Sequence, residues 1–158
     1  MNTKCIVVDT SLVIKWAIKE EYTDLALALL ADWTENGTII LAPALLSYEA
    51  TNVFHQRIRR GAYPFEDARR ALDEIIYELI VFDFASTPAL HIRAIQLSQQ
   101  FGLPAAYDAQ YLALAESKQC ELWTADRRLW NSIRGKLAWV HWLGDYHPVP
   151  PEDAYIPC

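Results

Sequence analysis

The sequence is short of the features that mark membrane proteins and proteins that coat nucleic acids. No apolar run reaches the ~18 residues that a membrane-spanning helix needs, and the N-terminal apolar run over residues 5–8 ends at Asp9. We therefore expect neither a signal peptide nor a membrane contact. Lys and Arg number 14 against 20 Asp and Glu, and the net charge of −6 argues against broad binding to phosphates. A nuclease remains compatible with this charge, because a site that binds divalent cations carries its positive charge in the metal.

Cysteine is also scarce. The three cysteines, Cys5, Cys120 and Cys158, lie far apart, are odd in number and show no spacing typical of a metal site. Reduced thiols in a cytoplasmic protein explain such a set best. We expect no chemistry from them.

What the sequence does have is the apolar material and the periodicity of one α/β domain. With 158 residues, 53% of them hydrophobic and 22% charged, the chain is large enough for one sizeable core. Short apolar runs typical of strands buried on both faces occur at residues 5–8, 38–41, 80–84, 121–124 and 139–143. Stretches with helical periodicity lie at residues 23–35, 45–60, 65–79, 88–101, 106–118 and 127–133.

This alternation predicts an α/β sandwich with a mainly parallel central sheet, helices on both faces and a site beyond the carboxyl ends of the strands. Two helices, separated by the break at residues 61–64, lie between the second and third strands, so we expect a protruding helical hairpin suited to binding a partner. From Gly144 onward, four prolines predict a tail that lies along the surface or is disordered. The expected division is a domain over residues 1–143 and a Pro-rich tail over residues 144–158.

Two aspartates follow apolar strands directly. Asp9 comes after the run at residues 5–8 and Asp126 after the run at residues 121–124, each with a helix behind it. Capping of that helix explains either residue taken alone. Ser11 is a second capping candidate, and its hydroxyl is also suited to a phosphate or a metal-bound water.

Two further acids lie within predicted helices. Glu49 shares a largely apolar helix face, where a carboxylate is costly unless it is paired or binds a metal. An ion pair with an arginine of another helix is the structural alternative. Asp108 lies near the start of an alanine-rich helix and shares a stripe with Tyr111, Leu112 and Ala115. The helix dipole alone would favour an aspartate at that position.

Convergence of the four carboxylates is hard to explain by structure alone. If the strands before Asp9 and Asp126 are neighbours, the acids meet, and two unit charges ~4 Å apart repel by about 4 kcal/mol at an effective dielectric of 20. Mg²⁺ or Mn²⁺ removes this repulsion, because both ions prefer oxygen ligands and keep water and phosphate oxygens in their shell. The same arrangement favours phosphodiester hydrolysis, with a carboxylate orienting the attacking water. We expect the metal-binding and catalytic residues to be Asp9, Glu49, Asp108 and Asp126.

These motifs resemble, in order and spacing, the PIN-domain ribonucleases, and most closely the VapC-like toxin branch. The matching stretches are Val-Val-Asp-Thr-Ser at residues 7–11, Ser-Tyr-Glu-Ala-Thr-Asn-Val at 47–53, Tyr-Asp-Ala-Gln-Tyr-Leu-Ala-Leu-Ala-Glu at 107–116 and Trp-Thr-Ala-Asp at 123–126. The resemblance implies a PIN-like three-layer sandwich and an endoribonuclease that depends on Mg²⁺ or Mn²⁺. It also implies a cytoplasmic homodimer and, often, a small antitoxin that covers the site.

The resemblance also assigns roles to single residues. It gives the family's acidic roles to the four acids, with Asp9 and Asp108 foremost as direct metal ligands, and it matches Ser11 and Thr124 to polar helpers near the strand ends. Arg127 and Arg128 follow the fourth acid directly. We expect at least one guanidinium of this pair to reach a substrate phosphate or to balance the acids.

Other functions predict other patterns. A haloacid-dehalogenase-like phosphatase requires an aspartate where this chain has Ser11, and a phospho-receiver requires an acidic pair before its acceptor strand; the sequence has neither. A PIN-like module that binds RNA or protein without cleaving stays open. So does a role chiefly as half of a repressing complex with an antitoxin. Which RNA is cut, and where, does not follow from the sequence.

Overall fold

The computed structural model describes residues 4–150 and contains a five-stranded sheet in the order β3-β2-β1-β4-β5, in which every pairing is parallel. The strands are β1 (Cys5–Val8), β2 (Ile39–Pro43), β3 (Ile80–Asp83), β4 (Glu121–Thr124) and β5 (Val140–Trp142). Ile6, Val7 and Val8 of the central strand are fully buried, as expected for a parallel strand covered on both faces. The strand order places β1 beside β4, which is the neighbourhood on which convergence of the acids depends.

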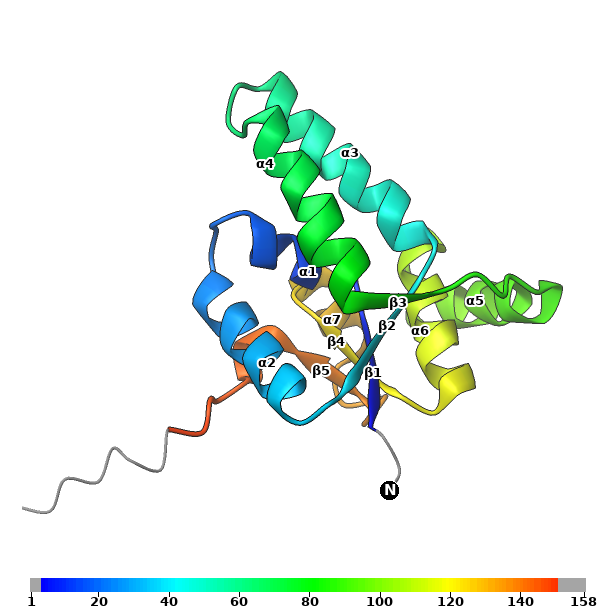
Figure 1. Ribbon diagram of the computed structural model, residues 1–158. Coiled ribbons are helices and arrows are strands. Elements are labelled where there is room, and N and C mark those ends of the chain that lie inside the picture. Colours follow the sequence, from blue (N-terminus) through cyan, green and yellow to red (C-terminus); the bar gives the residue numbers. More distant parts are fainter. Residues whose placement is uncertain (1–3, 151–158) are drawn as a thin grey trace, which may run out of the picture.

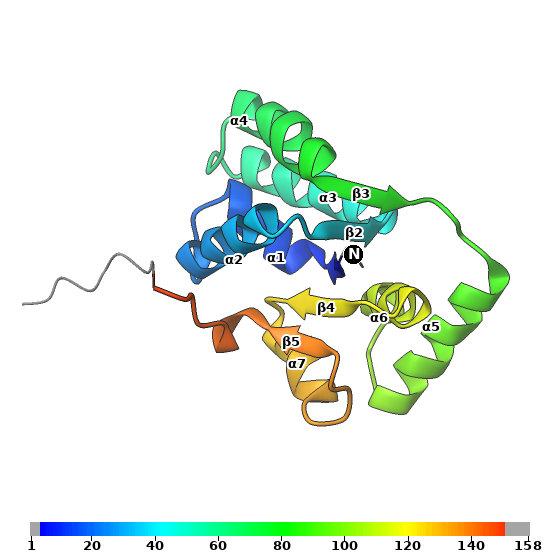
Figure 2. The ribbon, with the colours of Figure 1, turned by 60° about the horizontal axis from the view of Figure 1, so that its bottom comes forward.

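Helices fill every connection between the strands. The chain runs through α1 (Thr10–Ala17), α2 (Thr23–Glu35), α3 (Leu45–Arg59), α4 (Phe65–Arg70), α5 (Pro88–Phe101), α6 (Tyr107–Lys118) and α7 (Arg127–Ile133). Parallel crossovers are right-handed and the strand order reverses at β1, so the first two connections cover one face of the sheet and the last two cover the other. Figure 1 shows α2 and α6 on opposite sides of the sheet, and the turned view in Figure 2 shows α5 beside α6. The predicted three-layer α/β sandwich is confirmed.

The predicted helical hairpin consists of α3 and α4, which extend together away from the sheet (Figure 1). Gly61 makes the turn at a φ of 68°, a left-handed conformation that glycine adopts without steric cost. The ring of Tyr63 stacks on Phe54, and its hydroxyl donates to the Ala17 carbonyl at 3.1 Å, which ties the hairpin to α1. After α4 the chain continues as a π-helix over Ala71–Tyr77, so the helix predicted over residues 65–79 changes type within its length.

The expectation of three reduced cysteines is wrong for two of them. Cys5 and Cys120 form a disulfide with their Cα atoms 5.6 Å apart. Cys5 begins β1 and Cys120 directly precedes β4, and the register that pairs Ile6 with Glu121 sets the two cysteines opposite each other. The spacing of the cysteines in the sequence does not predict this disulfide, because the two residues are 115 positions apart and become neighbours only through the strand order. Cys158 lies outside the described residues.

Regular structure continues slightly beyond its expected end at Gly144. A short 3₁₀ helix spans Leu143–Asp145, and the Tyr146 ring then contacts Trp123 edge-on while its hydroxyl donates to the carboxylate of Asp32. The prolines limit regular structure only after this point, because the apolar rings here still pack on the domain. Residues 147–150 have no regular structure, and the rest of the predicted tail lies outside the described residues. Within residues 4–150, no helix is both long and apolar enough to cross a membrane.

Candidate active site

Asp9 forms the buried centre of the site. It follows β1, caps α1 and is 3% exposed. Its Oδ1 accepts hydrogen bonds from the Ser11 hydroxyl at 2.6 Å and from the Leu12 N–H at 3.2 Å, and its Oδ2 accepts one from the Thr124 hydroxyl. The capping explanation is therefore confirmed for Asp9. A cap alone does not account for burial of the whole carboxylate, because removing an ionised group from water is costly.

Ser11 and Thr124 join the carboxyl ends of β1 and β4 around this carboxylate. Thr124 is fully buried and, besides donating to Asp9, accepts the Asp126 N–H at 3.0 Å. Ser11 likewise accepts the Ala125 N–H at 3.0 Å. Both predicted polar helpers thus lie at the strand ends, with their hydroxyls engaged in positioning Asp9.

Glu49 reaches the site from α3 and is held by two hydroxyls. Its Oε1 accepts from the Tyr111 hydroxyl of α6 at 2.5 Å and from the Thr10 hydroxyl of α1 at 3.1 Å, and these two hydroxyl oxygens are 2.8 Å apart. Burial, followed by the charge of Glu49, raises the pKa of Tyr111 above its usual range, so its hydroxyl stays a donor. Among the described residues Glu49 has no ion pair, and the arginine partner considered from sequence is not found.

Replacement of Tyr111 by phenylalanine is expected to loosen Glu49. The variant loses the shorter of the two hydrogen bonds to a half-buried carboxylate, so the free energy of unfolding should fall by about 1–2 kcal/mol. If Glu49 acts in catalysis, kcat should fall about 10-fold, as for other groups that orient a ligand. Tyr48→Phe is the matched control, because Tyr48 is 73% exposed on the same helix as Glu49. A Tyr111→Phe protein with wild-type stability and kcat would show that this hydroxyl does not position Glu49.

Asp126 and Asp108 complete the set of acids. Asp126 caps α7, and its Oδ1 accepts the Arg128 N–H at 2.8 Å and the Leu129 N–H at 3.3 Å, so the capping explanation is confirmed here too. Asp108 lies in the first turn of α6 and is half-buried. Within the part of the chain that the structure describes, its carboxylate has neither a hydrogen bond nor an ion pair.

The carboxylates affect one another through space. The pKa of Asp9 is raised from 3.8 to about 7; burial is the main cause, the surrounding hydroxyl and N–H donors oppose it, and the charge of Asp108 adds to it. Burial also raises the pKa of Asp108, with further contributions from the charges of Asp126 and Glu49. All four predicted acids therefore surround one region at the carboxyl ends of β1 and β4. This region is the point in the sheet where the strand order reverses.

The donor set fits a hard divalent cation. Within residues 4–150, no three His, Cys, Asp or Glu side chains lie close enough together to hold an ion without rearrangement. The acids nevertheless offer only carboxylate oxygens, the ligands that Mg²⁺ and Mn²⁺ prefer. Asp9 is fixed by its neighbours, whereas Asp108 has no protein partner among the described residues and is free to reorient toward an ion. A bound cation would also offset the cost of burying these charges and the repulsion between them, the two effects that raise the pKa of Asp9 and Asp108.

The two arginines beside Asp126 have different environments. The Arg127 guanidinium lies 5.0 Å from the centre of the Trp142 ring and donates to the Tyr22 hydroxyl at 3.3 Å, so it is occupied by aromatic neighbours. Arg128 is exposed, and no carboxylate in the described residues pairs with its guanidinium. Arg128 is the more available of the two for a phosphate.

The sequence does not single out Thr10 or the hydroxyl of Tyr111, the two groups that hold Glu49. The helical pattern places Tyr111 only in a packed stripe, and the residue is indeed only 1% exposed. The available signal was its hydroxyl, because a buried tyrosine hydroxyl requires a hydrogen-bond partner. Thr10 lies beside Asp9 and gave no separate signal.

Comparison with known families agrees with this arrangement of acids on a parallel sheet. The family model described as the PIN domain matches residues 6–135, which include all four acids. The chain belongs to the PIN-domain family. Among characterised relatives, this PIN-domain chain is 30% identical over 129 residues to ribonuclease VapC3 of Pyrobaculum aerophilum, and the alignment covers 78% of this chain and 91% of that protein.

Solved structures share the fold. A Pyrobaculum aerophilum protein of known crystal structure matches with a TM-score of 0.63 at 23% identity, over 90% of this chain and 92% of that chain. The VapBC2 complex of Rickettsia felis, bound to a DNA fragment from its promoter, contains a chain that matches with a TM-score of 0.64 at 14% identity, over 87% of this chain and 98% of that chain. At these identities the structures establish the fold, and they confirm the PIN-like sandwich predicted from the motifs.

Proposed function

We propose that this PIN-domain protein is a metal-dependent endoribonuclease that hydrolyses RNA phosphodiester bonds, and that it is the toxin of a toxin–antitoxin pair. The observation that carries the proposal is the arrangement of Asp9, Glu49, Asp108 and Asp126 around the point where the strand order reverses. The stability of the fold gives no reason for four acids that repel one another to lie at one place. The 30% identity to a protein named ribonuclease VapC3 supports RNA as the substrate.

The residues that would hold Mg²⁺ or Mn²⁺ are the four acids, with Asp9 and Asp108 first. The ion, when bound, supplies Lewis-acid chemistry that favours attack of water on phosphorus and departure of the leaving oxygen. The chain holds two of these carboxylates in fixed positions, because Asp9 accepts three hydrogen bonds and Glu49 accepts two. Asp108, which lacks a protein partner in the described residues, has the free acceptor capacity needed to orient the attacking water.

Substrate contacts are assigned more narrowly than the sequence suggested. Arg128 is the proposed contact to a phosphate of the RNA backbone. Arg127 is a weaker candidate, because its guanidinium lies on Trp142 and donates to Tyr22. Ser11 and Thr124 serve chiefly to position Asp9, and a direct contact with the substrate would require them to exchange a hydrogen bond.

The proposed partners are RNA, a cognate antitoxin and a second copy of the chain. Large apolar side chains remain exposed on the edge strand β3 and along α5, including Val81, Ile92 and Ile95, each more than half exposed. Apolar surface of this kind is typical of protein contacts. Matching structures include toxin–antitoxin complexes from Klebsiella pneumoniae and Rickettsia felis, which support an antitoxin as partner. We place the protein in the cytoplasm, where RNA substrates are found, although the Cys5–Cys120 disulfide removes the reduced-thiol argument for that location.

Removal of divalent metal is expected to abolish cleavage, and this experiment tests the proposal. Purified, partner-free protein is incubated with a mixed RNA pool in Mg²⁺, in Mn²⁺ and in EDTA, followed by return of the metal. We expect cutting in either metal, loss in EDTA and recovery on return, with circular dichroism unchanged. Undiminished cutting in EDTA would contradict the metal-dependent mechanism. RNA binding without any metal-dependent turnover would favour the alternative, a PIN-like module that binds RNA or protein without cleaving it.

A further inference from the structure

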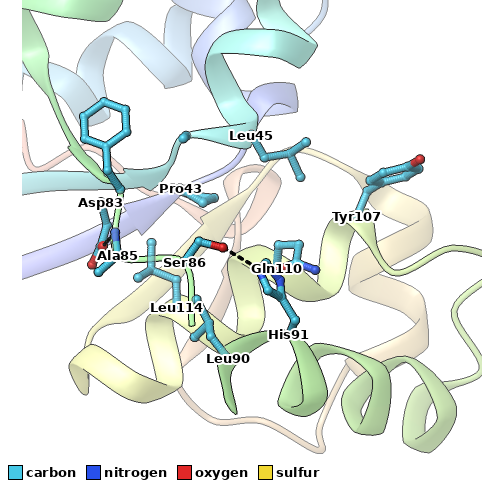
Figure 3. Close-up of a pocket in the computed structure, with 12 residues that line it drawn as sticks. Pro43, Leu45, Asp83, Ala85, Ser86, Leu90, His91, Tyr107, Gln110 and Leu114 are labelled. Carbon is cyan, nitrogen blue, oxygen red and sulfur yellow. Dashed lines mark hydrogen bonds between the residues drawn. The ribbon is translucent and has the colours of Figure 1, made fainter. Parts of the chain in front are cut away.

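A pocket of about 250 Å³ opens beside the acids, at the carboxyl ends of β2 and β3. Figure 3 shows its walls converging from the start of α3, the loop after β3, and helices α5 and α6. The apolar part of the lining comes chiefly from Pro43, Leu45, Leu90 and Leu114. The pocket is smaller than the roughly 300–1,000 Å³ typical of pockets for drug-sized ligands, so its size suits one planar ring system.

The pocket shares two helices with the proposed catalytic site. Leu45 lies on α3 one turn before Glu49 and on the same face, and Tyr107 directly precedes Asp108 at the start of α6. An RNA strand whose phosphate lies at the acids would therefore carry a neighbouring base past the pocket. Tyr107 is 64% exposed at the rim, where its ring offers a surface for stacking.

The polar side of the pocket is a chain of three side chains. Ser86 Oγ lies 2.5 Å from His91 Nε2, and His91 Nδ1 lies 2.9 Å from the Gln110 amide oxygen. An amide oxygen only accepts, so His91 Nδ1 carries a proton, and in the neutral imidazole Nε2 then accepts from the Ser86 hydroxyl. This arrangement uses one of the two lone pairs of the Gln110 oxygen. Its amide nitrogen, which has no partner among residues 4–150, is left with two N–H donors.

The pocket carries no unbalanced charge. The carboxylate of Asp83, the one acid in the lining, accepts from Lys118 Nζ at 2.8 Å and from the Ala85 N–H at 2.8 Å. The Lys118 contact keeps the pKa of Asp83 below its usual range, so the pair stays charged and mutually neutralised. A neutral ring with hydrogen-bonding groups suits this pocket better than a phosphate, an arginine or a carboxylate side chain.

We propose that this pocket binds the base of a nucleotide next to the scissile phosphate and selects a base that presents a carbonyl oxygen to Gln110. The inference rests on the proposed ribonuclease activity and adds a specificity-determining site to it. Adenine is recognised by glutamine through both the amide oxygen and the amide nitrogen. His91 already uses one of the two lone pairs of this oxygen, so the free hydrogen-bonding capacity of the amide lies mainly in its two N–H donors. Guanine, uracil and cytosine carry a carbonyl oxygen with two lone pairs for these donors, whereas adenine offers only ring nitrogens with one lone pair each, so adenine should bind more weakly.

The test maps the nucleotides that flank each cut in a randomised RNA pool, with KM and kcat measured on one preferred RNA. We expect adenine to be depleted at one flanking position with the wild type. Gln110→Ala should erase the depletion and raise KM about 3- to 10-fold, the value of one hydrogen bond, with kcat unchanged. His91→Ala should release the Gln110 oxygen and allow adenine. Gln99→Ala, an exposed glutamine on α5 outside the pocket lining, is the matched control and should behave as wild type.

A second measurement requires no cleavage. In metal-free protein, the side-chain amide NMR signals of Gln110, assigned by their absence in Gln110→Ala, should shift on titration with UMP more than with AMP. If the wild type cuts RNA but its flanking preference and KM survive both pocket substitutions, the pocket inference is overturned and the ribonuclease proposal stands. If the wild type fails to cut with metal, the ribonuclease proposal fails, and the NMR titration alone decides whether the pocket takes a base. Altered oligomeric mass in Gln110→Ala, with preference intact, would instead identify a protein contact and overturn the inference.

Discussion

Asp9→Asn is expected to abolish RNA cleavage and, at the same time, to stabilise the metal-free protein at neutral pH. The cleavage rate should fall by more than about 100-fold. Loss of a residue that only supports a metal ligand costs up to about 100-fold, and Asp9 is proposed to be a ligand itself. Stabilisation should follow because Asp9 is a buried carboxyl whose pKa is raised to about 7 by burial. An asparagine keeps the size of the side chain and the helix cap to Leu12, and it carries no charge to bury.

The direction of the pH dependence follows from this pKa. In the unfolded chain Asp9 ionises near 3.8, whereas in the folded protein it ionises near 7. Between these values the unfolded state loses a proton that the folded state keeps, so the wild type loses stability as pH rises from about 4 to about 7. Asp9→Asn removes this loss. We expect the variant to gain about 2–4 kcal/mol over wild type at neutral pH and little near pH 4.

Denaturant unfolding in EDTA, at neutral and at acid pH, measures the effect. Asp24→Asn serves as the control, because Asp24 is an exposed carboxylate in the first turn of α2 and its replacement should change stability by no more than about 0.5 kcal/mol. Stability that does not differ between Asp9→Asn and wild type at neutral pH would show that burial of Asp9 imposes no penalty. Residual cleavage by Asp9→Asn in Mg²⁺ at the wild-type rate would remove Asp9 from the mechanism.

Removal of the Cys5–Cys120 disulfide is expected to lower the free energy of unfolding by about 2–4 kcal/mol. The bond joins residues 115 positions apart, so it restricts the unfolded chain strongly, and it holds β1 beside β4 at the end opposite Asp9 and Thr124. For a chain of this size the loss corresponds to a melting temperature lower by about 5–15 °C. Cleavage at 25 °C should persist, because the hydrogen bonds around Asp9 do not involve the cysteines.

The comparison uses Cys5→Ala with Cys120→Ala, both in a Cys158→Ala background that excludes exchange with the third thiol. Thermal melts are recorded with and without dithiothreitol. The parent should lose stability on reduction, whereas the variant should be insensitive to the reductant. Equal melting temperatures for the oxidised parent and the variant would show that the bond adds no stability.

Much of the fold was predictable because the signals are local. The apolar runs before Asp9 and Asp126 predicted β1 and β4 with the bounds that the structure has, and the helical periods did the same for α2, α5 and α7. A short apolar run ended by an acid is readable from sequence, since it depends only on neighbouring residues. The acids themselves were identified in the same way, and their grouping followed from the assumption that β1 and β4 are adjacent.

The tertiary structure decided which side chains meet. Sequence alone determined that Asp9 and Asp126 end buried strands and that Glu49 and Asp108 face inward from helices, because strand and helix periodicity are properties of a continuous stretch. It did not determine that Tyr111 and Thr10 hold Glu49, or that Cys5 bonds to Cys120. These partners lie 39 to 115 positions apart and become neighbours only through the β3-β2-β1-β4-β5 order and the packing of α1, α3 and α6. Pairings of this kind depend on the whole sheet, so no local pattern in the chain encodes them.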